Sequence, residues 1–217
     1  DLAPKITINF LETYPFSRAC YVGVQEYNCD IKNIAMQHAS RNDESLFFRM
    51  HPKKEYSIGD DGDSIPKADY IFTMGELGSR LVAESGYPDE KNILTGSPRF
   101  DHVVREARKS KIEYDDICIL FAASGVIEIE IPAFLLSARV IKNMPGVKLI
   151  LREHFFWKIS DRKEVIDLLD GIEISTCSLD EDLERADLVL FTTTTLAEEA
   201  LMKSIPVWQI ASVKSNF

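Results

Sequence analysis

The sequence predicts an α/β fold made of two parallel-sheet domains. Short apolar runs alternate with helical stretches along most of the 217 residues, which is typical of parallel strands joined by helical crossovers. A highly charged stretch at 101–115 interrupts this alternation, and the pattern then starts again. We therefore expect an N-terminal domain over 1–112 and a C-terminal domain over 113–217.

The first half contains four expected strands and begins with one of them, so its sheet is expected to be incomplete. These strands lie at 5–11, 31–37, 69–74 and 92–96. One helix is expected to begin at Pro15, because proline suits the first helical turn. A second helix is expected over 75–86, ended by Gly86 and Pro88. The polar stretch 41–66 is expected to form a loop.

The second half contains five expected strands, which are enough for a complete sheet. They lie at 117–123, 147–152, 172–176, 188–191 and 207–210. Helices are expected at 128–143, 164–170 and 179–186, and Ser178 with Glu181 forms a capping-box pattern before the last. Ligands of open α/β sheets bind beyond the carboxyl ends of the strands. Residues that follow these strands are therefore the first candidates for a site.

The composition excludes several kinds of partner. The formal net charge is −10 and no basic stripe is visible, so a nucleic-acid-binding surface is not expected. The four cysteines are scattered without C-x-x-C spacing, which indicates reduced thiols in a cytoplasmic protein rather than zinc ligands or disulfides. No stretch reaches the ~18–20 apolar residues of a membrane span. The N-terminus has no signal-peptide pattern.

Four consecutive threonines, Thr192 to Thr195, follow the apolar run 188–191 and precede a short helix. Their hydroxyls and the N–H groups of the first helical turn suit phosphate oxygens. Thr195 and Glu198 have capping-box spacing, which gives Glu198 a structural role. Glu199 is displaced by ~100° around the helix and is left to accept ligand hydroxyls, such as a ribose diol. The alternatives are a solvated Glu199, weighted equally, and threonines that only favour a strand end.

Two further strands end in residues that suit a phosphate. Arg152 and His154 follow the strand 147–152, where Arg152 suits charge neutralisation and His154 suits a bond to phosphate or to a leaving group. A surface ion pair between Arg152 and Glu153 and a structural His154 are the alternatives, and these are favoured when the residues are taken alone. Ser124 and Gly125 would bring backbone close to a diphosphate, although such a pair is a weak signal.

The first half offers candidates for a general base. Glu12 follows the first strand and His38 follows the second, and either would serve if partly desolvated. The alternatives are that Glu12 complements the dipole of the helix at Pro15 and that His38 is a structural loop residue. Arg99 suits a phosphate or an ion pair with Asp101, and the pair is slightly favoured.

No metal site is expected in this sequence. The acidic stretch 59–64, GDDGDS, resembles half of a calcium loop, but it lacks the closing Glu at the required spacing. It also contains the nearest match to an Asp-x-Asp motif, and no expected strand leads into it.

Three segments resemble the GT-B glycosyltransferases and their epimerase relatives. TTTTLAEEALMKSIPV resembles their Ser/Thr-rich turn followed by Glu-Ala-Leu and Pro-Val. YIFTMGELGSRLVAESGYPDEKNILTGSPRFD resembles the segment that closes their N-terminal domain. IAMQHAS is similar to the Gln-His-Gly segment of bacterial surface-polysaccharide transferases that act with Kdo, sialic acid or glycerophosphate. These motifs cover most of the chain in the expected order.

The resemblance implies two Rossmann-like domains that face a cleft, with a nucleotide-sugar donor held mainly by the C-terminal domain. Glu199 matches the residue that binds the donor's ribose, and Thr194 and Thr195 match positions that meet phosphate. Arg152 and His154 take the place of a basic residue and a His-Pro motif. The positions that would line the cleft from the other side are Gln37 and His38.

The sequence departs from the family's pattern at several positions. Ala39 stands where Gly is usual after Gln-His, Phe155 stands where Pro is usual, and Ser204 stands where Gly is usual. The chain also stops at Phe217, before the family's closing helices, and the first domain lacks opening strands. We therefore expect a fragment of a longer enzyme.

The expected activity is metal-independent transfer of a sugar from a nucleotide-sugar, a substrate rather than a cofactor, onto a surface polysaccharide or lipid-linked glycan. Glu12 or His38 would deprotonate the acceptor, while the threonines and Arg152 would stabilise the departing phosphate. The alternatives are a nucleotide-sugar 2-epimerase of the same fold and a non-catalytic nucleotide- or glycan-binding module. A cytoplasmic location is expected, and any contact with the inner membrane face would be made by parts beyond this sequence.

Overall fold

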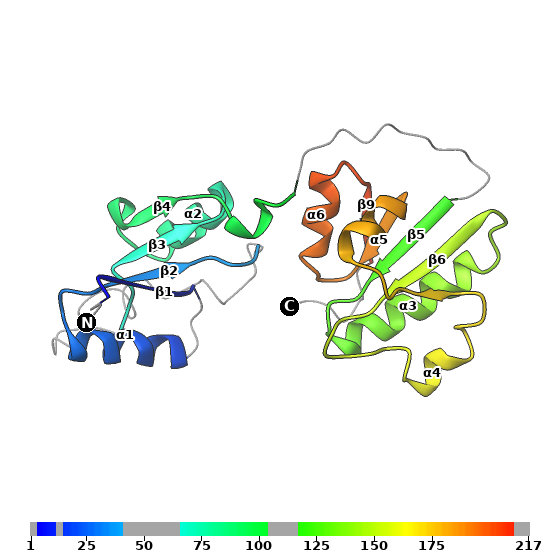
Figure 1. Cartoon of the computed structure of the whole chain (residues 1–217), viewed down its shortest axis with the longest axis horizontal. Helices are drawn as coiled ribbons and strands as arrows, with labels where there is room; N and C mark the ends of the chain where they lie inside the picture. Colours follow the sequence, from blue (N-terminus) through cyan, green and yellow to red (C-terminus); the bar gives the residue numbers. More distant parts are fainter. Residues whose placement is uncertain (1–3, 12–14, 41–65, 104–116, 211–217) are drawn as a thin grey trace. The chain divides into compact units, whose positions relative to one another are not determined.

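The structure, a computed structural model, describes residues 4–11, 15–40, 66–103 and 117–210. It divides into two compact units, Asp1–Asp101 and His102–Asn216, which are described separately (Figure 1). Each unit contains a parallel sheet and helices, so the predicted α/β fold with two parallel-sheet domains is confirmed. The predicted boundary near 112 lies outside the described residues and stays a prediction, as does the loop expected at 41–66 for all but its last residue.

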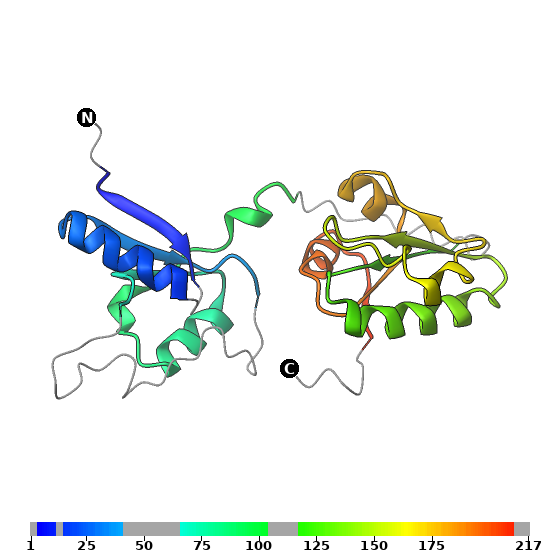
Figure 2. The same ribbon diagram turned by 90° about the horizontal axis from the view of Figure 1, so that it is seen from below.

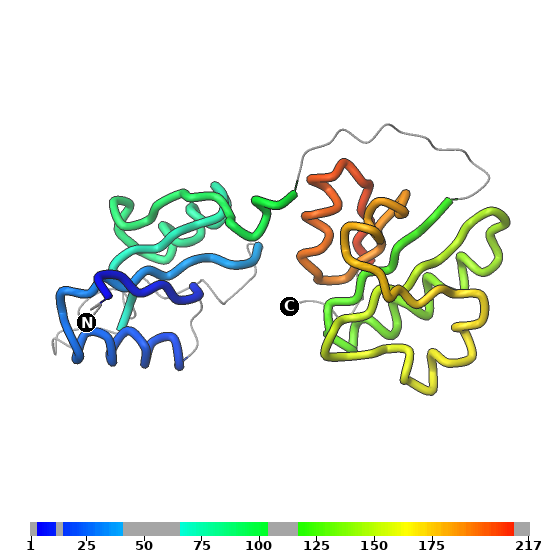
Figure 3. Tube along the Cα trace, viewed as in Figure 1, coloured from blue at the N-terminus to red at the C-terminus, as the bar shows by residue number. Residues whose placement is uncertain are grey.

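The first unit is a four-stranded parallel sheet whose strand order follows the chain. Its strands are β1 (Ile6–Phe10), β2 (Lys32–Met36), β3 (Tyr70–Thr73) and β4 (Asn92–Leu94), in the order β1-β2-β3-β4 (Figure 3). Helix α1 (Pro15–Tyr27) follows β1, and α2 (Glu76–Glu84) follows β3. Two short 3₁₀ helices, η2 (Asp89–Lys91) and η3 (Pro98–Phe100), flank β4. Helix α2 ends as predicted, because Gly86 turns the chain with a φ of 88°.

One buried cluster holds this unit together. Tyr21 of α1 and Val82 of α2 pack with Ala35 of β2 and Ile71 of β3, and all four are at most 5% exposed. Burial of the Tyr21 ring raises the pKa of its hydroxyl to about 12. Burying a side chain such as that of Val82 or Ile71 contributes roughly 1.5–3 kcal/mol, so the packing of the helices on the sheet stabilises this unit.

The second unit is a five-stranded parallel sheet with a reversal in its strand order. Its strands are β5 (Ile117–Ala122), β6 (Val147–Arg152), β7 (Glu173–Ile174), β8 (Leu188–Phe191) and β9 (Val207–Gln209). They lie in the order β7-β6-β5-β8-β9, and every pair is parallel. The chain therefore first builds outward from β5 to β7 and then returns to the other side of β5.

The helices of this unit cover both faces of its sheet (Figure 2). Helix α3 (Ile127–Ile141) packs on one face, where Phe134 meets Phe121 edge-on with ring centroids 5.3 Å apart. Helices α5 (Leu179–Arg185) and α6 (Leu196–Met202) pack on the other face, against Leu120 and its neighbours. Successive residues of β5 thus point to opposite cores, as the alternation of a strand requires.

Helix α4 (Lys163–Ile166) is shorter than the predicted helix over 164–170. Beyond it the N–H groups of Leu168 and Leu169 bond to carbonyls three residues back, so the chain continues in tight turns. Among the described helices the longest is α3, with 15 residues, and none is long and apolar enough to cross a membrane.

Candidate functional site

The strand order of the second unit selects one candidate site. The strand order reverses between β5 and β8, which are hydrogen-bonded parallel neighbours, so the loops that follow them diverge at the carboxyl edge of the sheet. Such a topological switch point is where open α/β sheets bind ligands. Ser124 follows β5 and Thr193 follows β8, and the Thr193 hydroxyl donates a hydrogen bond of 2.8 Å to the Ser124 hydroxyl. Two hydroxyls thus meet at the switch point.

His154, which follows the adjacent strand β6, packs against the same turn. A Cβ atom on Gly125 would lie 3.0 Å from His154 Nδ1, and Gly125 has a φ of 92°. Glycine is therefore required here, both for the left-handed backbone and for the close approach of the imidazole. His154 Nδ1 accepts a hydrogen bond of 3.4 Å from the N–H of Phe156, which places the proton of the neutral ring on Nε2. This nitrogen is a donor suited to a phosphate oxygen.

Glu130 also belongs to this site, although the sequence did not single it out. Its side chain is fully buried, and Oε1 accepts hydrogen bonds from the N–H of Ser124 and, at 2.9 Å, from the N–H of Gly125. Burial raises the pKa of the Glu130 carboxyl. The backbone donors expected to approach a diphosphate are therefore already bonded to a carboxyl of the chain itself. The helical pattern of α3 does not indicate that Glu130 bonds to this turn, because Glu130 lies among apolar residues of a helix.

The threonine turn differs from its prediction in detail. The predicted capping box of Thr195 and Glu198 is wrong, because Thr195, directly before α6, has helical backbone angles and its side chain makes no capping bond. The capping hydroxyl comes from Thr194, whose Oγ1 accepts a hydrogen bond of 3.3 Å from the N–H of Leu196. Thr192 is buried and Thr193 is the exposed member of the turn.

The two carboxylates of α6 have different surroundings. Glu199 is 5% exposed, so the alternative of a solvated helix residue is wrong. Its Oε2 lies 3.6 Å from Nε2 of His102, a residue of the same unit. Glu198, which was expected to have the structural role, is half-buried and caps nothing. The role of Glu199 toward a ribose stays a prediction.

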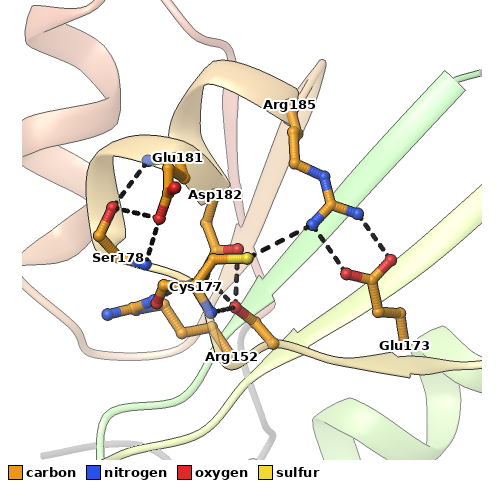
Figure 4. A network of polar contacts seen from close by, with 8 residues as sticks. Arg152, Glu173, Cys177, Ser178, Glu181, Asp182 and Arg185 are labelled. Carbon is orange, nitrogen blue, oxygen red and sulfur yellow. Dashed lines mark hydrogen bonds and ion pairs between the residues drawn. The ribbon is translucent and has the colours of Figure 1, made fainter.

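Arg152 is held inside the unit by an ion pair that the sequence did not indicate (Figure 4). Its guanidinium donates at 2.6 Å to Asp182, which is fully buried, and at 3.0 Å to the carbonyl of Cys177. Ser175 donates to the same carboxylate, so Asp182 connects β6, the loop after β7 and α5. The alternative pairing of Arg152 with Glu153 is wrong, because Glu153 accepts the N–H of Ser160 at 2.8 Å.

Two further polar contacts hold the loop and helix after β7, and the first of them, a capping box, was predicted from the sequence. The capping box of Ser178 and Glu181 forms, with the Glu181 N–H donating to the Ser178 hydroxyl at 3.3 Å. Arg185 at the end of α5 makes a two-pronged pair with Glu173 of β7, with distances of 2.7 and 2.6 Å (Figure 4). This pair lowers the pKa of the Glu173 carboxyl.

In the first unit, Gln37, which was expected to line a cleft, forms a structural bridge. Gln37 is 5% exposed, its amide nitrogen donates to the carbonyl of Ala39 at 3.0 Å, and its amide oxygen accepts the N–H of Met74 at 3.0 Å. It packs against Gly78 of α2, where a Cβ atom would lie 2.2 Å from the amide oxygen. Both ends of the amide are therefore used in joining the ends of β2 and β3, and the place of Gln37 at a cleft stays a prediction.

The other candidates of the first unit are placed only in part. His38 is half-buried at the end of β2, with its ring 4.6 Å from the ring of Phe10. Arg99 is exposed in η3. Glu12 lies outside the described residues. The role of His38 or Glu12 as a base and that of Arg99 toward a phosphate stay predictions.

An exposed aromatic segment begins directly after His154. Phe155, Phe156 and Trp157 are 79%, 72% and 53% exposed, although side chains of this kind are usually buried. The Phe155 ring lies 4.5 Å from the His154 ring, and the three aromatics border an open pocket of ≈ 390 Å³ with Lys158 and Arg162. An exposed patch of this kind indicates an interaction surface. The sequence signal was available as three consecutive aromatic residues at 155–157.

Comparison with known proteins supports the fold at low sequence identity. No protein-family model and no curated protein matches this chain. Its structure is similar to that of S. aureus MnaA in complex with UDP, with a TM-score of 0.65, 18% identity and coverage of 96% of this chain and 59% of that chain. A putative UDP-N-acetylglucosamine 2-epimerase from Listeria monocytogenes gives a TM-score of 0.60 at 17% identity, covering 94% and 56%.

A third similar structure is the wall teichoic acid polymerase TagF, in an H444N variant with CDPG, with a TM-score of 0.50 at 11% identity, covering 95% of this chain and 54% of that one. The chain therefore spans a little more than half the length of each of these proteins. Together with the two parallel sheets, these likenesses show a GT-B-like fold built from two Rossmann-like domains.

Proposed function

We propose that this chain binds a nucleotide-sugar at the switch point of its second unit and belongs to a glycosyltransferase that extends a surface polysaccharide or lipid-linked glycan. The observation that carries the proposal is the meeting of Ser124, Thr193 and His154 at the ends of three neighbouring strands. Two hydroxyls and an imidazole N–H suit the oxygens of a diphosphate. The UDP bound by the similar MnaA supports a nucleotide diphosphate as the ligand class.

The proposed chemistry is displacement at the sugar carbon with a nucleoside diphosphate as the leaving group. Hydrogen bonds from the Ser124 and Thr193 hydroxyls and from His154 would strengthen as negative charge develops on the leaving diphosphate. Glu199, buried on α6, is the proposed acceptor for the ribose hydroxyls. His38 or Glu12 is the proposed base for the acceptor hydroxyl.

A nucleotide-sugar 2-epimerase is the second candidate. The specific observation in its favour is the greater structural likeness to MnaA and the Listeria protein than to TagF, with TM-scores of 0.65 and 0.60 against 0.50. The two candidates share the nucleotide site and differ in the fate of the sugar. A transferase moves the sugar from the diphosphate to the acceptor, whereas a 2-epimerase must exchange the hydrogen at C2 of the sugar.

A ligand screen followed by an isotope experiment tests the proposal. We expect UDP, CDP or GDP, or one of their sugars, to raise the thermal unfolding midpoint of the 217-residue chain. With the stabilising nucleotide-sugar in D₂O, glycan transfer without deuterium at C2 supports the transferase, and deuterium at C2 supports the epimerase. Binding without either reaction would leave a non-catalytic binding module. An absence of stabilisation by any nucleotide would contradict the site itself.

A further inference from the structure

Glu130 is a fully buried acid at the switch point, and only half of its carboxyl is used among the described residues. Oε1 accepts the N–H groups of Ser124 and Gly125, whereas Oε2 is buried and has no hydrogen-bond partner in this part of the chain. An ionised carboxylate with a buried, unpartnered oxygen is unfavourable, because the negative charge loses its solvation. A neutral carboxyl fits the same position at a lower cost.

The carboxyl is also next to the groups proposed to bind phosphate. It holds the backbone of Ser124, whose hydroxyl accepts from Thr193, and of Gly125, against which the His154 ring packs. The titratable side chain beside Glu130 is that of His154, on the loop after β6. Glu128, the other acid in the first turn of α3, is exposed. A phosphate at this turn would therefore lie close to Glu130.

We propose that Glu130 is a positioning residue that shapes the Ser124–Gly125 turn and makes nucleotide-sugar binding at that turn proton-linked. The inference rests on the proposed function. A diphosphate beside the turn repels the ionised Glu130 and tolerates the neutral form, so ligand binding takes up a proton. The affinity for the ligand consequently falls as the pH rises through the pKa of Glu130 in the folded chain.

Glu130→Gln separates the charge of this residue from its shape. The glutamine oxygen still accepts the two N–H groups, and the side chain stays neutral at every pH. Glu128→Gln is the matched control, because it removes the same charge from the same helix turn at an exposed position. The ligand should be a nucleotide-sugar such as UDP-N-acetylglucosamine, since its diester phosphates have no proton to lose near neutral pH, unlike a phosphomonoester with a pKa of about 6.

The experiment is calorimetric titration of the three proteins between pH 5 and 8, in buffers of different ionisation enthalpy. We expect the wild type and Glu128→Gln to take up protons and to bind about tenfold more weakly at pH 8 than Glu130→Gln does. Uptake that remains in Glu130→Gln comes from groups other than Glu130. An equal pH profile and equal uptake in wild type and Glu130→Gln would overturn the proposal.

A ligand-free measurement keeps this inference separate from the proposed function. The raised pKa of Glu130 means that its neutral form stabilises the fold below the ordinary value of 4.5, and that this advantage is lost as the pH rises through the folded pKa. The unfolding midpoint of the wild type should therefore fall relative to that of Glu130→Gln over this range. If no nucleotide-sugar binds either protein, the proposed function fails, while this midpoint difference still decides whether Glu130 is proton-linked.

If Glu130→Gln does not fold, His154→Asn is the second variant. It retains Glu130 and replaces the imidazole beside it with a side chain that carries no charge at any pH. Proton uptake that persists on binding to His154→Asn supports the proposal, and uptake that disappears overturns it.

Discussion

The hydroxyl of Thr193 donates a 2.8 Å hydrogen bond to the hydroxyl of Ser124, joining two loops that are 69 residues apart in the sequence. The bond lies across the point where the strand order of the second sheet reverses. A ligand that bound there would replace one hydroxyl partner with a charged oxygen, and hydrogen bonds to charged groups are stronger than those between neutral ones.

Loss of either hydroxyl should weaken nucleotide binding. We expect Ser124→Ala and Thr193→Val each to raise the Kd for the stabilising nucleoside diphosphate about tenfold, since a hydrogen bond to a charged group contributes about 1.5–3 kcal/mol. The double variant should lose less than the sum, because the two hydroxyls also bond to each other. Isothermal titration calorimetry measures both effects. Ser160→Ala, which removes a half-buried hydroxyl from the same unit, is the control. Unchanged affinity in Ser124→Ala, in Thr193→Val and in the double variant would place the phosphates elsewhere.

Trp157 should report binding at this site through its fluorescence. The backbone N–H of Trp157 donates to the carbonyl of His154 at 3.2 Å, and its side chain is 53% exposed, so a ligand that contacts His154 will alter the surroundings of the Trp157 ring. The chain has two tryptophans, and Trp208→Phe leaves Trp157 as the reporter. We expect its emission to change on titration with the nucleotide. In Trp157→Phe the remaining Trp208, on β9, should not respond, and the reverse pattern would argue against a ligand beside His154.

The buried ion pair of the second unit should contribute much more to stability than the exposed one beside it. Asp182→Ala removes the carboxylate that accepts from Arg152 and Ser175, and breaking a buried pair in this way costs about 3 kcal/mol. Glu173→Gln breaks the pair with Arg185, where the side chains are 50% and 41% exposed, and should leave stability nearly unchanged. Urea unfolding at pH 7 gives both values. Similar losses in the two variants would show that burial does not decide the difference.

The effect of Gly78→Ala in α2 on stability should change sign when the residue at position 37 is changed. In the wild type a Cβ at Gly78 would lie 2.2 Å from the Gln37 amide oxygen, so Gly78→Ala should break the amide bridge and destabilise the chain by about 1–3 kcal/mol. In a Gln37→Ala background the same change should stabilise it by about 1 kcal/mol, the usual preference of a helix for alanine. A double-mutant cycle followed by urea unfolding measures the coupling. Equal effects in both backgrounds would contradict the bridge.

The sequence by itself determined the order and type of the elements, because strand and helix periodicities are local properties. Five strands of the second half and four of the first were predicted, and each is present in a parallel sheet. The capping box at Ser178 could also be predicted, since it involves residues three apart. The cap at Thr195 could not, because neighbouring threonines compete for the same N–H groups and Thr194 makes the bond.

Only the tertiary structure decided which polar residues meet. The pairing of Arg152 with Asp182, the bridge made by Gln37 and the contact of Ser124 with Thr193 all join segments far apart in the chain. Glu130 is the clearest case, because its helix pattern marks it as one more residue of α3, while its buried carboxyl binds the turn that follows β5. Sequence patterns register periodicity along one element, whereas a site depends on which strand ends the sheet order brings together.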